Sequence, residues 1–172
     1  MDRYVNDSIS LLDQVKIQAQ VLVPVLRALR TELGTARANQ LITTALRDWS
    51  HALFQAVAAD KPGTPQDKWT ALTLDNMPRI GDAVQYTTLK QEPEAFEFDV
   101  TSCRYADFFR ALGEPELGGV LLCEADFHIA DVAEGTVELT RRQTIMQGAT
   151  HCDFRYRMKS QAPSSPADAA KK

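Results

Sequence analysis

Apolar residues recur at three- and four-residue steps through the first sixty positions and predict two long helices. The first, over about 9–33, carries an apolar stripe wide enough to be covered on more than one side. Pro24 lies inside this stripe and predicts a kink or a split into two pieces. Gly34 is a stop signal, and Thr35 can cap the second helix, which is expected over about 36–58.

The period of the pattern changes in the middle of the chain. Residues 60–65 contain two prolines and a glycine and mark a break, and the segment that follows has too little periodicity to predict an element. Beyond Asp82, apolar and polar residues alternate, around 84–88 and again around 96–100. This alternation predicts two strands of an antiparallel pair.

The last third of the chain predicts two more helices and two more strands. We expect helices over about 104–112 and 116–129, a strand over 136–146 and a last strand over 151–158. The predicted fold class is therefore α+β, with N-terminal helices and a roughly four-stranded antiparallel sheet covered by helices on one face. The expected domain organisation is one domain over 1–159, divided into a helical region at 1–59 and an α+β region at 80–159, with a disordered tail at 160–172.

Charge and composition exclude several classes of partner. The net charge is -4 and the pI is near 5.4, so no basic excess is present to neutralise nucleic-acid phosphates. No apolar run reaches the length of a membrane span, and the first residues lack the order of a signal peptide. Three cysteines, an odd number, favour free thiols in a reducing cytoplasm. The wide N-terminal stripe suggests a homodimer.

The three cysteines occupy positions from which they could meet at one site. Cys103 begins a predicted helix that Thr101 and Ser102 can cap, so we expect nearby backbone N–H groups to lower its thiol pKa. Cys123 lies on a predicted helix, and Cys152 lies on the inward face of the last strand. The alternative is that all three are inert core residues.

Two charged residues join this set. Asp126 is three residues after Cys123 and shares its helix face, where it could act as a general base or could equally be a solvated surface acid. Arg141 falls on an inward strand face, and a buried arginine needs a carboxylate from Asp126, Glu124 or a ligand. Alternatively, Arg141 lies at the sheet edge and extends its guanidinium to water.

Seven short segments stand out along the chain: Val15-Lys16-Ile17-Gln18-Ala19, Pro24 to Gly34, Cys103 to Phe109, Leu112 to Gly118, Cys123-Glu124-Ala125-Asp126, Arg141, and Gly148 to Phe154. In this order and spacing they resemble the L-2-amino-thiazoline-4-carboxylic acid hydrolase family. The ending of the chain is also similar to the last hairpin of small-molecule-binding domains of the 4-vinyl-reductase type. That second resemblance implies an antiparallel sheet whose helices close a ligand pocket.

The family resemblance implies a hydrolase that opens a small cyclic amidine or isothiourea bearing a carboxylate. In this hypothesis Cys103 is the nucleophile, Asp126 holds the amidine or activates water, and Arg141 binds the substrate carboxylate. Cys123, Cys152 and Tyr105 complete the substrate-binding set. No cofactor is expected. Two alternatives stay open: a small-molecule-binding module without turnover, and a zinc-held site, for which the sequence offers no closely spaced ligand pair.

Overall fold

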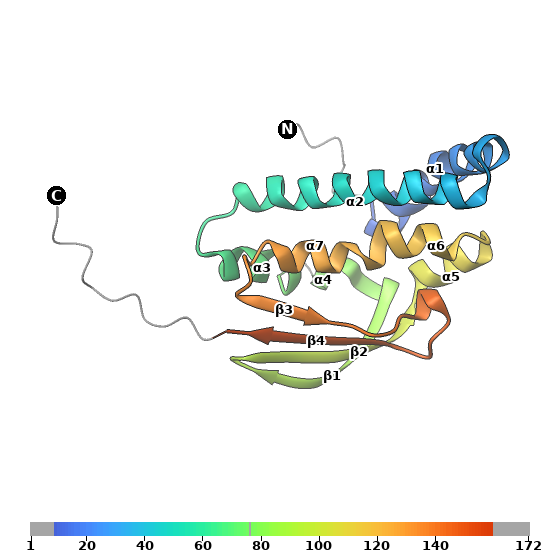
Figure 1. The fold of residues 1–172 in the computed structure, drawn as a ribbon. Coiled ribbons are helices and arrows are strands. Elements are labelled where there is room, and N and C mark those ends of the chain that lie inside the picture. Colours follow the sequence, from blue (N-terminus) through green and yellow to red (C-terminus); the bar gives the residue numbers. More distant parts are fainter. Residues whose placement is uncertain (1–8, 76, 160–172) are drawn as a thin grey trace, which may run out of the picture.

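The computed structural model describes residues 9–75 and 77–159, which form an α+β structure with helices layered on one face of a sheet (Figure 1). The sheet has four antiparallel strands in the order β1-β2-β4-β3, which confirms the predicted fold class. The strands are β1 (Val84–Glu92), β2 (Ala95–Cys103), β3 (Val137–Thr140) and β4 (Cys152–Met158). The helices are α1 (Leu11–Leu33), α2 (Thr35–Ala59), α3 (Pro65–Thr73), α4 (Met77–Ile80), α5 (Arg104–Ala111), α6 (Pro115–Gly118) and α7 (Ala125–Asp131).

The two central strands supply the apolar face that the helices cover. Along β2 and β4 every second residue is buried: Phe96, Phe98, Val100, Cys152, Phe154 and Tyr156. Phe98 and Phe154 are register partners, and their rings stack with centroids 4.7 Å apart. Period-two burial on neighbouring strands produces one continuous apolar surface, so the prediction that Cys152 faces inward is confirmed.

The long N-terminal helices differ from expectation in two details. Helix α1 is continuous through Pro24 and is not split. Pro24 and Gln20 are both exposed, so water can reach the Gln20 carbonyl that lost its partner. Thr35 is the first residue of α2 and not its cap, because Gly34, with φ of 79°, ends one helix and precedes the other.

Helix α3 was not predicted from the sequence. Its start is a capping box in which the Thr64 hydroxyl accepts from the Asp67 N–H while the Asp67 carboxylate accepts from the Thr64 N–H. Pro65 occupies the first turn, where its missing N–H costs nothing. Trp69 anchors the helix, with 1% of its surface exposed. The cap signal was present in the sequence, but the helix is too short for its apolar period to be recognised.

Two elements near the candidate site are less regular than predicted. The expected helix over 116–129 is α6, a π-helical turn η2 (Gly119–Cys123), and α7. The expected strand over 136–146 ends at Thr140 and gives way to a 3-10 turn, η3 (Ile145–Gln147). The strand stops because the N–H groups of Arg142 and Gln143 donate to the Asp153 carboxylate, each at 2.9 Å, instead of to a neighbouring strand.

Several predictions concern regions or properties that the structure does not test. The tail predicted at 160–172 lies outside the described residues, and the domain division and the cytoplasmic location stay predictions. Among the described residues, no helix has the length and apolar character needed to cross a bilayer. Residues of the predicted stripe such as Leu12, Val23 and Leu26 are buried within the protein, whereas the outer face of α1 exposes Ile17, Val21 and Val25, one turn apart; the homodimer stays a prediction.

Candidate functional site

Arg141 is the most constrained charged residue of the candidate site. Only 5% of its side chain is exposed. Its Nη1 donates to Asp126 Oδ2 at 2.5 Å, and its Nη2 donates to the Cys123 carbonyl at 2.7 Å. The expectation that a buried Arg141 pairs with a carboxylate is confirmed with Asp126, and the sheet-edge alternative is wrong. Glu124, the other suggested partner, pairs with Arg47 instead.

Aromatic rings further restrict the Arg141 guanidinium. Its Cζ lies 5.0 Å from the centroid of the Phe127 ring and 5.1 Å from that of Phe154. Cation–π contacts of this kind stabilise the charge where water is excluded. Phe127 comes from α7 and Phe154 from β4, so the guanidinium joins the helical layer to the sheet.

The π-helical turn makes the Cys123 carbonyl available to Arg141. The Glu124 N–H donates to the Gly119 carbonyl, five residues back, and the Phe127 N–H donates to Glu124. In a regular α-helix the Phe127 N–H would instead bind the Cys123 carbonyl. The irregular turn therefore frees one backbone acceptor where Arg141 can reach it.

Asp126 has the titration behaviour of a group that can exchange protons near neutral pH. Burial raises the pKa of its carboxyl from 3.8 to about 6, against the charge and hydrogen bond of Arg141, which lower it. The side chain keeps 33% of its surface accessible. Asp126 is therefore neither a fully solvated surface acid nor sealed in the core.

The environment of Cys103 contradicts one prediction. Cys103 ends β2 and itself occupies the N-cap position of α5, so Thr101 and Ser102 do not cap this helix. The backbone N–H groups of Ala106 and Tyr105 do lower its pKa, but burial outweighs them and the pKa of the Cys103 thiol is raised. The predicted lowering is wrong because the thiol is partly buried.

The other two thiols are also held in the neutral form. Burial, followed by the charge of Asp126, raises the pKa of Cys123 to about 12. Cys152 is 7% exposed, and its sulfur accepts a hydrogen bond from the Ile145 N–H at 3.2 Å. Burial raises the pKa of Cys152 as well. All three cysteines are free thiols.

The structure brings the sequence-predicted residues together. The pKa of Cys123 responds to the charges of Asp126, Arg141, Cys152 and Cys103. Tyr105 adjoins Cys103, and burial, with a smaller contribution from that thiol, raises its pKa to about 12. We name Cys103, Cys123, Cys152, Asp126 and Arg141 the thiol–carboxylate cluster.

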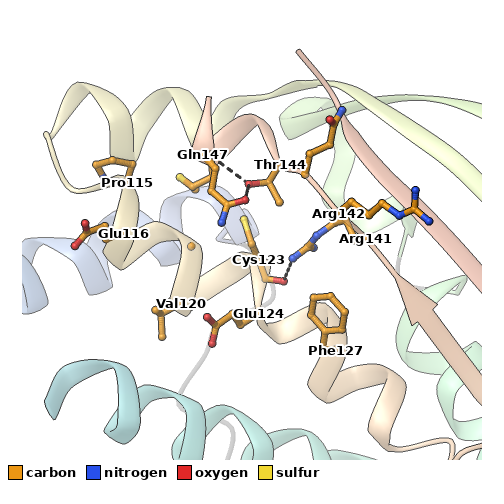
Figure 2. A pocket seen from close by; sticks show the side chains of 13 residues that line it. Pro115, Glu116, Val120, Cys123, Glu124, Phe127, Arg141, Arg142, Thr144 and Gln147 are labelled. Atoms are coloured by element: carbon orange, nitrogen blue, oxygen red, sulfur yellow. Dashed lines mark hydrogen bonds between the residues drawn. The ribbon is translucent and has the colours of Figure 1, made fainter. Parts of the chain in front are cut away.

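A pocket of about 570 Å³ opens beside this cluster (Figure 2). It is lined by Pro115, Glu116, Gly119, Val120, Cys123, Glu124 and Phe127 on the helical side, and by Arg141, Arg142, Gln143, Thr144, Met146 and Gln147 on the other. Of the predicted site residues, Cys123 and Arg141 line it, whereas Cys103, Tyr105, Asp126 and Cys152 do not. Sequence reasoning did not identify residues 143–147 as a pocket-lining loop, because the expected strand ran as far as residue 146.

The donor set does not favour a metal centre. Within residues 9–75 and 77–159, no group of three His, Cys, Asp or Glu side chains is arranged to hold a metal ion. The zinc-held alternative therefore has no ready set of ligands in this range.

Comparisons with known proteins identify one family. No curated protein matches this chain. A similar solved structure is the phenol-responsive sensory domain of the transcription activator PoxR with phenol, at 14% identity and a TM-score of 0.46, covering 80% of this chain and 72% of that one. At this identity the similarity concerns the fold alone. The model of the L-2-amino-thiazoline-4-carboxylic acid hydrolase family matches residues 14–156, and the chain belongs to that family.

Proposed function

We propose that this protein is a hydrolase that opens a small cyclic amidine or isothiourea bearing a carboxylate, at the thiol–carboxylate cluster. Family membership implies a hydrolase, and the family's name supplies the substrate class. The observation that carries the proposal is Asp126: a reachable carboxyl with a pKa of about 6, held by Arg141 and surrounded by thiols. A base with this pKa is poised to take and return a proton near pH 7.

Cys103 is the proposed nucleophile, with Asp126 as its base. Cys123 has a pKa of about 12, and the Cys152 sulfur is buried and already accepts an N–H. Cys103 and Cys123 are both partly exposed, but the Cys103 sulfur faces two backbone N–H groups that favour its charged form. Because its pKa is nonetheless raised, it needs a base during attack, as a serine nucleophile does.

The proposed reaction has two steps. The Cys103 sulfur bonds to the ring carbon between nitrogen and sulfur while its proton passes to Asp126. A ring C–N or C–S bond then breaks, and the departing nitrogen or sulfur receives that proton. Water next attacks the same carbon while Asp126 takes a proton from it. The bond between that carbon and the Cys103 sulfur then breaks, and the sulfur receives the proton back from Asp126. One water is consumed per ring opened, and no redox partner is needed.

Arg141 has a narrower role in this proposal than a free substrate clamp would have. Two of its five N–H groups are donated to Asp126 and to the Cys123 carbonyl. We propose that it mainly fixes Asp126, and that its remaining donors add positive charge to the pocket wall that it lines. Cys123, Cys152 and Tyr105 serve as walls for the substrate.

A ring-opening assay tests this proposal. Purified protein is incubated with 2-amino-thiazoline-4-carboxylate, and the mass gain of one water is followed for wild type, Cys103→Ala, Cys103→Ser and Cys123→Ser. We expect turnover by wild type, loss in both Cys103 variants and retention in Cys123→Ser. Unchanged turnover in Cys103→Ala would eliminate this nucleophile. No turnover by wild type would remove the substrate class.

A second candidate is a binding module that holds the same ligand without turnover. The observation that favours it is that the pKa of each of the three thiols is raised, which suits packing better than attack. The two candidates differ in the same assay, because a binding module shows saturable heat of binding by calorimetry while the ligand's mass stays unchanged.

A further inference from the structure

The orientation of the Gln147 side-chain amide indicates which chemical group of a ligand the pocket can bind. Gln147 lines the pocket at the end of the 3-10 turn η3, and its side chain is exposed there. Thr144, three residues earlier, is 4% exposed and caps this turn. The backbone N–H of Gln147 donates to the Thr144 hydroxyl oxygen at 3.2 Å.

The Thr144 hydroxyl determines which end of the Gln147 amide is free. It donates its own proton to Gln147 Oε1 at 3.1 Å. With the amide reversed, this buried hydroxyl would lose its acceptor, which is costly for a group shielded from water. Gln147 therefore keeps its oxygen on Thr144, and its Nε2 has no hydrogen-bond partner among the described residues.

Other charges of the pocket favour an anionic group beside this amide. Arg141 contributes a buried guanidinium with unused N–H donors, its charge being paired with Asp126 at 2.5 Å, and the exposed Arg142 adds a second positive charge to the lining. Glu124 lines the pocket too, but its two oxygens accept from Arg47 at 2.5 and 2.8 Å, which offsets its charge. In Figure 2 the side chains of Gln147, Thr144 and Cys123 gather on one side of the pocket, and Glu116 lies at the other.

We propose that the pocket binds a ligand carboxylate through the Gln147 Nε2 amide, with Thr144 as the positioning residue and Arg141 as the supporting charge. The ligand class is a small carboxylate-bearing molecule. The inference rests on the proposed function only in identifying that ligand as a substrate, because the amide geometry would favour a carboxylate in a binding module as well. Gln147 is then the residue that distinguishes acids from their uncharged analogues.

A test independent of turnover uses sodium acetate as the probe. Full-length ¹⁵N-labelled protein is titrated, and the Gln147 side-chain amide signal is assigned by its loss in Gln147→Met. We expect a saturating shift of this signal, with roughly millimolar affinity for so small an anion. Sodium chloride at the same ionic strength should not reproduce it. An unmoved Gln147 signal would overturn the inference, whatever the enzyme assay shows.

The role of Thr144 is tested with matched variants. Thr144→Val keeps the shape but removes the hydroxyl, and Thr144→Ser restores it. We expect the affinity for acetate, measured from the shift of the Gln147 signal, to fall about tenfold in Thr144→Val. In Thr144→Ser we expect it to return to the wild-type value. Equal affinity in both variants would refute the positioning role.

Turnover adds a separate readout. If the ring-opening assay succeeds, Gln147→Met should raise KM for 2-amino-thiazoline-4-carboxylate about tenfold with little change in kcat. The carboxylate-free ring, 2-amino-thiazoline, should show no such change, and Gln20→Met on the exposed surface of α1 serves as the matched control. A carboxylate preference that survives Gln147→Met would contradict the inference and leave the proposed function standing.

Discussion

Arg141 and Asp126 form an ion pair across 2.5 Å that links the end of β3 to the first turn of α7. The arginine side of the pair is buried, whereas the carboxylate keeps a third of its surface accessible. The pair thus has one end fixed in the protein and one end partly accessible. Because of this asymmetry, Arg141 can hold the Asp126 carboxyl group in place while that group stays able to exchange a proton.

Replacing Arg141 should destabilise the fold markedly. Arg141→Met leaves Asp126 without its cation and the Cys123 carbonyl without its donor, and we expect a loss of about 3 kcal/mol in the free energy of unfolding. Urea denaturation measures this loss. The neighbouring Arg142 is exposed, so Arg142→Met is a matched control that should stay within about 0.5 kcal/mol of wild type. Equal losses in both variants would contradict the structural role of Arg141.

Asp126 should give the stability curve a recognisable dependence on pH. Its folded pKa of about 6 lies above the ordinary value of 3.8, so between these pH values the native state binds more protons than the unfolded state. Its contribution to stability is therefore fully present below about pH 4 and is lost as pH rises through 6.

Urea midpoints across pH 4 to 8 measure this contribution when wild type is compared with Asp126→Asn, which cannot titrate. The stability of wild type relative to the variant should fall over this range and level off above pH 7. A difference that rises with pH would mean that the pKa of Asp126 lies below its usual range.

The three thiols should alkylate slowly in the native protein. Because the pKa of each is raised, the thiolate fraction at pH 7 is smaller than in an unfolded chain. Iodoacetamide labelling followed by peptide mass spectrometry should give slower modification at Cys103, Cys123 and Cys152 in the native protein than in urea. A native thiol that reacts faster than in urea would show that its pKa is lowered.

A close approach in the helical wall of the pocket should make Gly118 sensitive to substitution. A Cβ at this position would lie 2.6 Å from Phe109 Cγ and 2.8 Å from Met146 Cε, whereas one at Gly119 meets nothing within 4 Å. We expect Gly118→Ala to cost about 1 to 3 kcal/mol and Gly119→Ala to be neutral or slightly stabilising. Thermal or urea unfolding of the two variants measures this difference. Similar stabilities of Gly118→Ala and Gly119→Ala would argue against this packing.

The exposed stripe of α1 should act in self-association. Ile17, Val21 and Val25 are 53%, 65% and 47% exposed, and an apolar row of this kind favours burial against another surface. We expect a homodimer by light scattering and a monomer for Val21→Glu. A wild-type monomer at micromolar concentration would contradict the expectation.

The sequence predicted the elements whose period is sustained. Phe96, Phe98 and Val100 alternate over enough residues to identify a half-buried strand, and the long helices repeat over six or more turns. Short elements set by single hydrogen bonds were not predictable. The end of β3 depends on the Asp153 carboxylate, which is distant in sequence from the N–H groups it binds.

The grouping of the candidate residues was predictable from the sequence, but their electrostatics were not, and their role as a functional site stays a prediction. Helix spacing and strand alternation brought Cys123, Asp126 and Cys152 together, and the structure places them near one another. Arg141 was expected within a strand and lies just beyond the end of β3. The pKa of Cys103 was mispredicted because a helix start is recognisable in a sequence and the burial that opposes it is not. Gln147 was missed because its orientation depends on a 3-10 turn whose first two residues, 145 and 146, were expected to end a strand.

The pH dependence of ring opening tests the central claim most directly. With 2-amino-thiazoline-4-carboxylate as substrate, kcat/KM of wild type should rise with pH through an apparent pKa near 6, the value at which Asp126 becomes a base. Asp126→Asn should lose about 100-fold or more in rate along with this inflection. An absence of turnover, or a rate whose pH profile is the same in wild type and Asp126→Asn, would contradict the claim that the thiol–carboxylate cluster is a hydrolytic site.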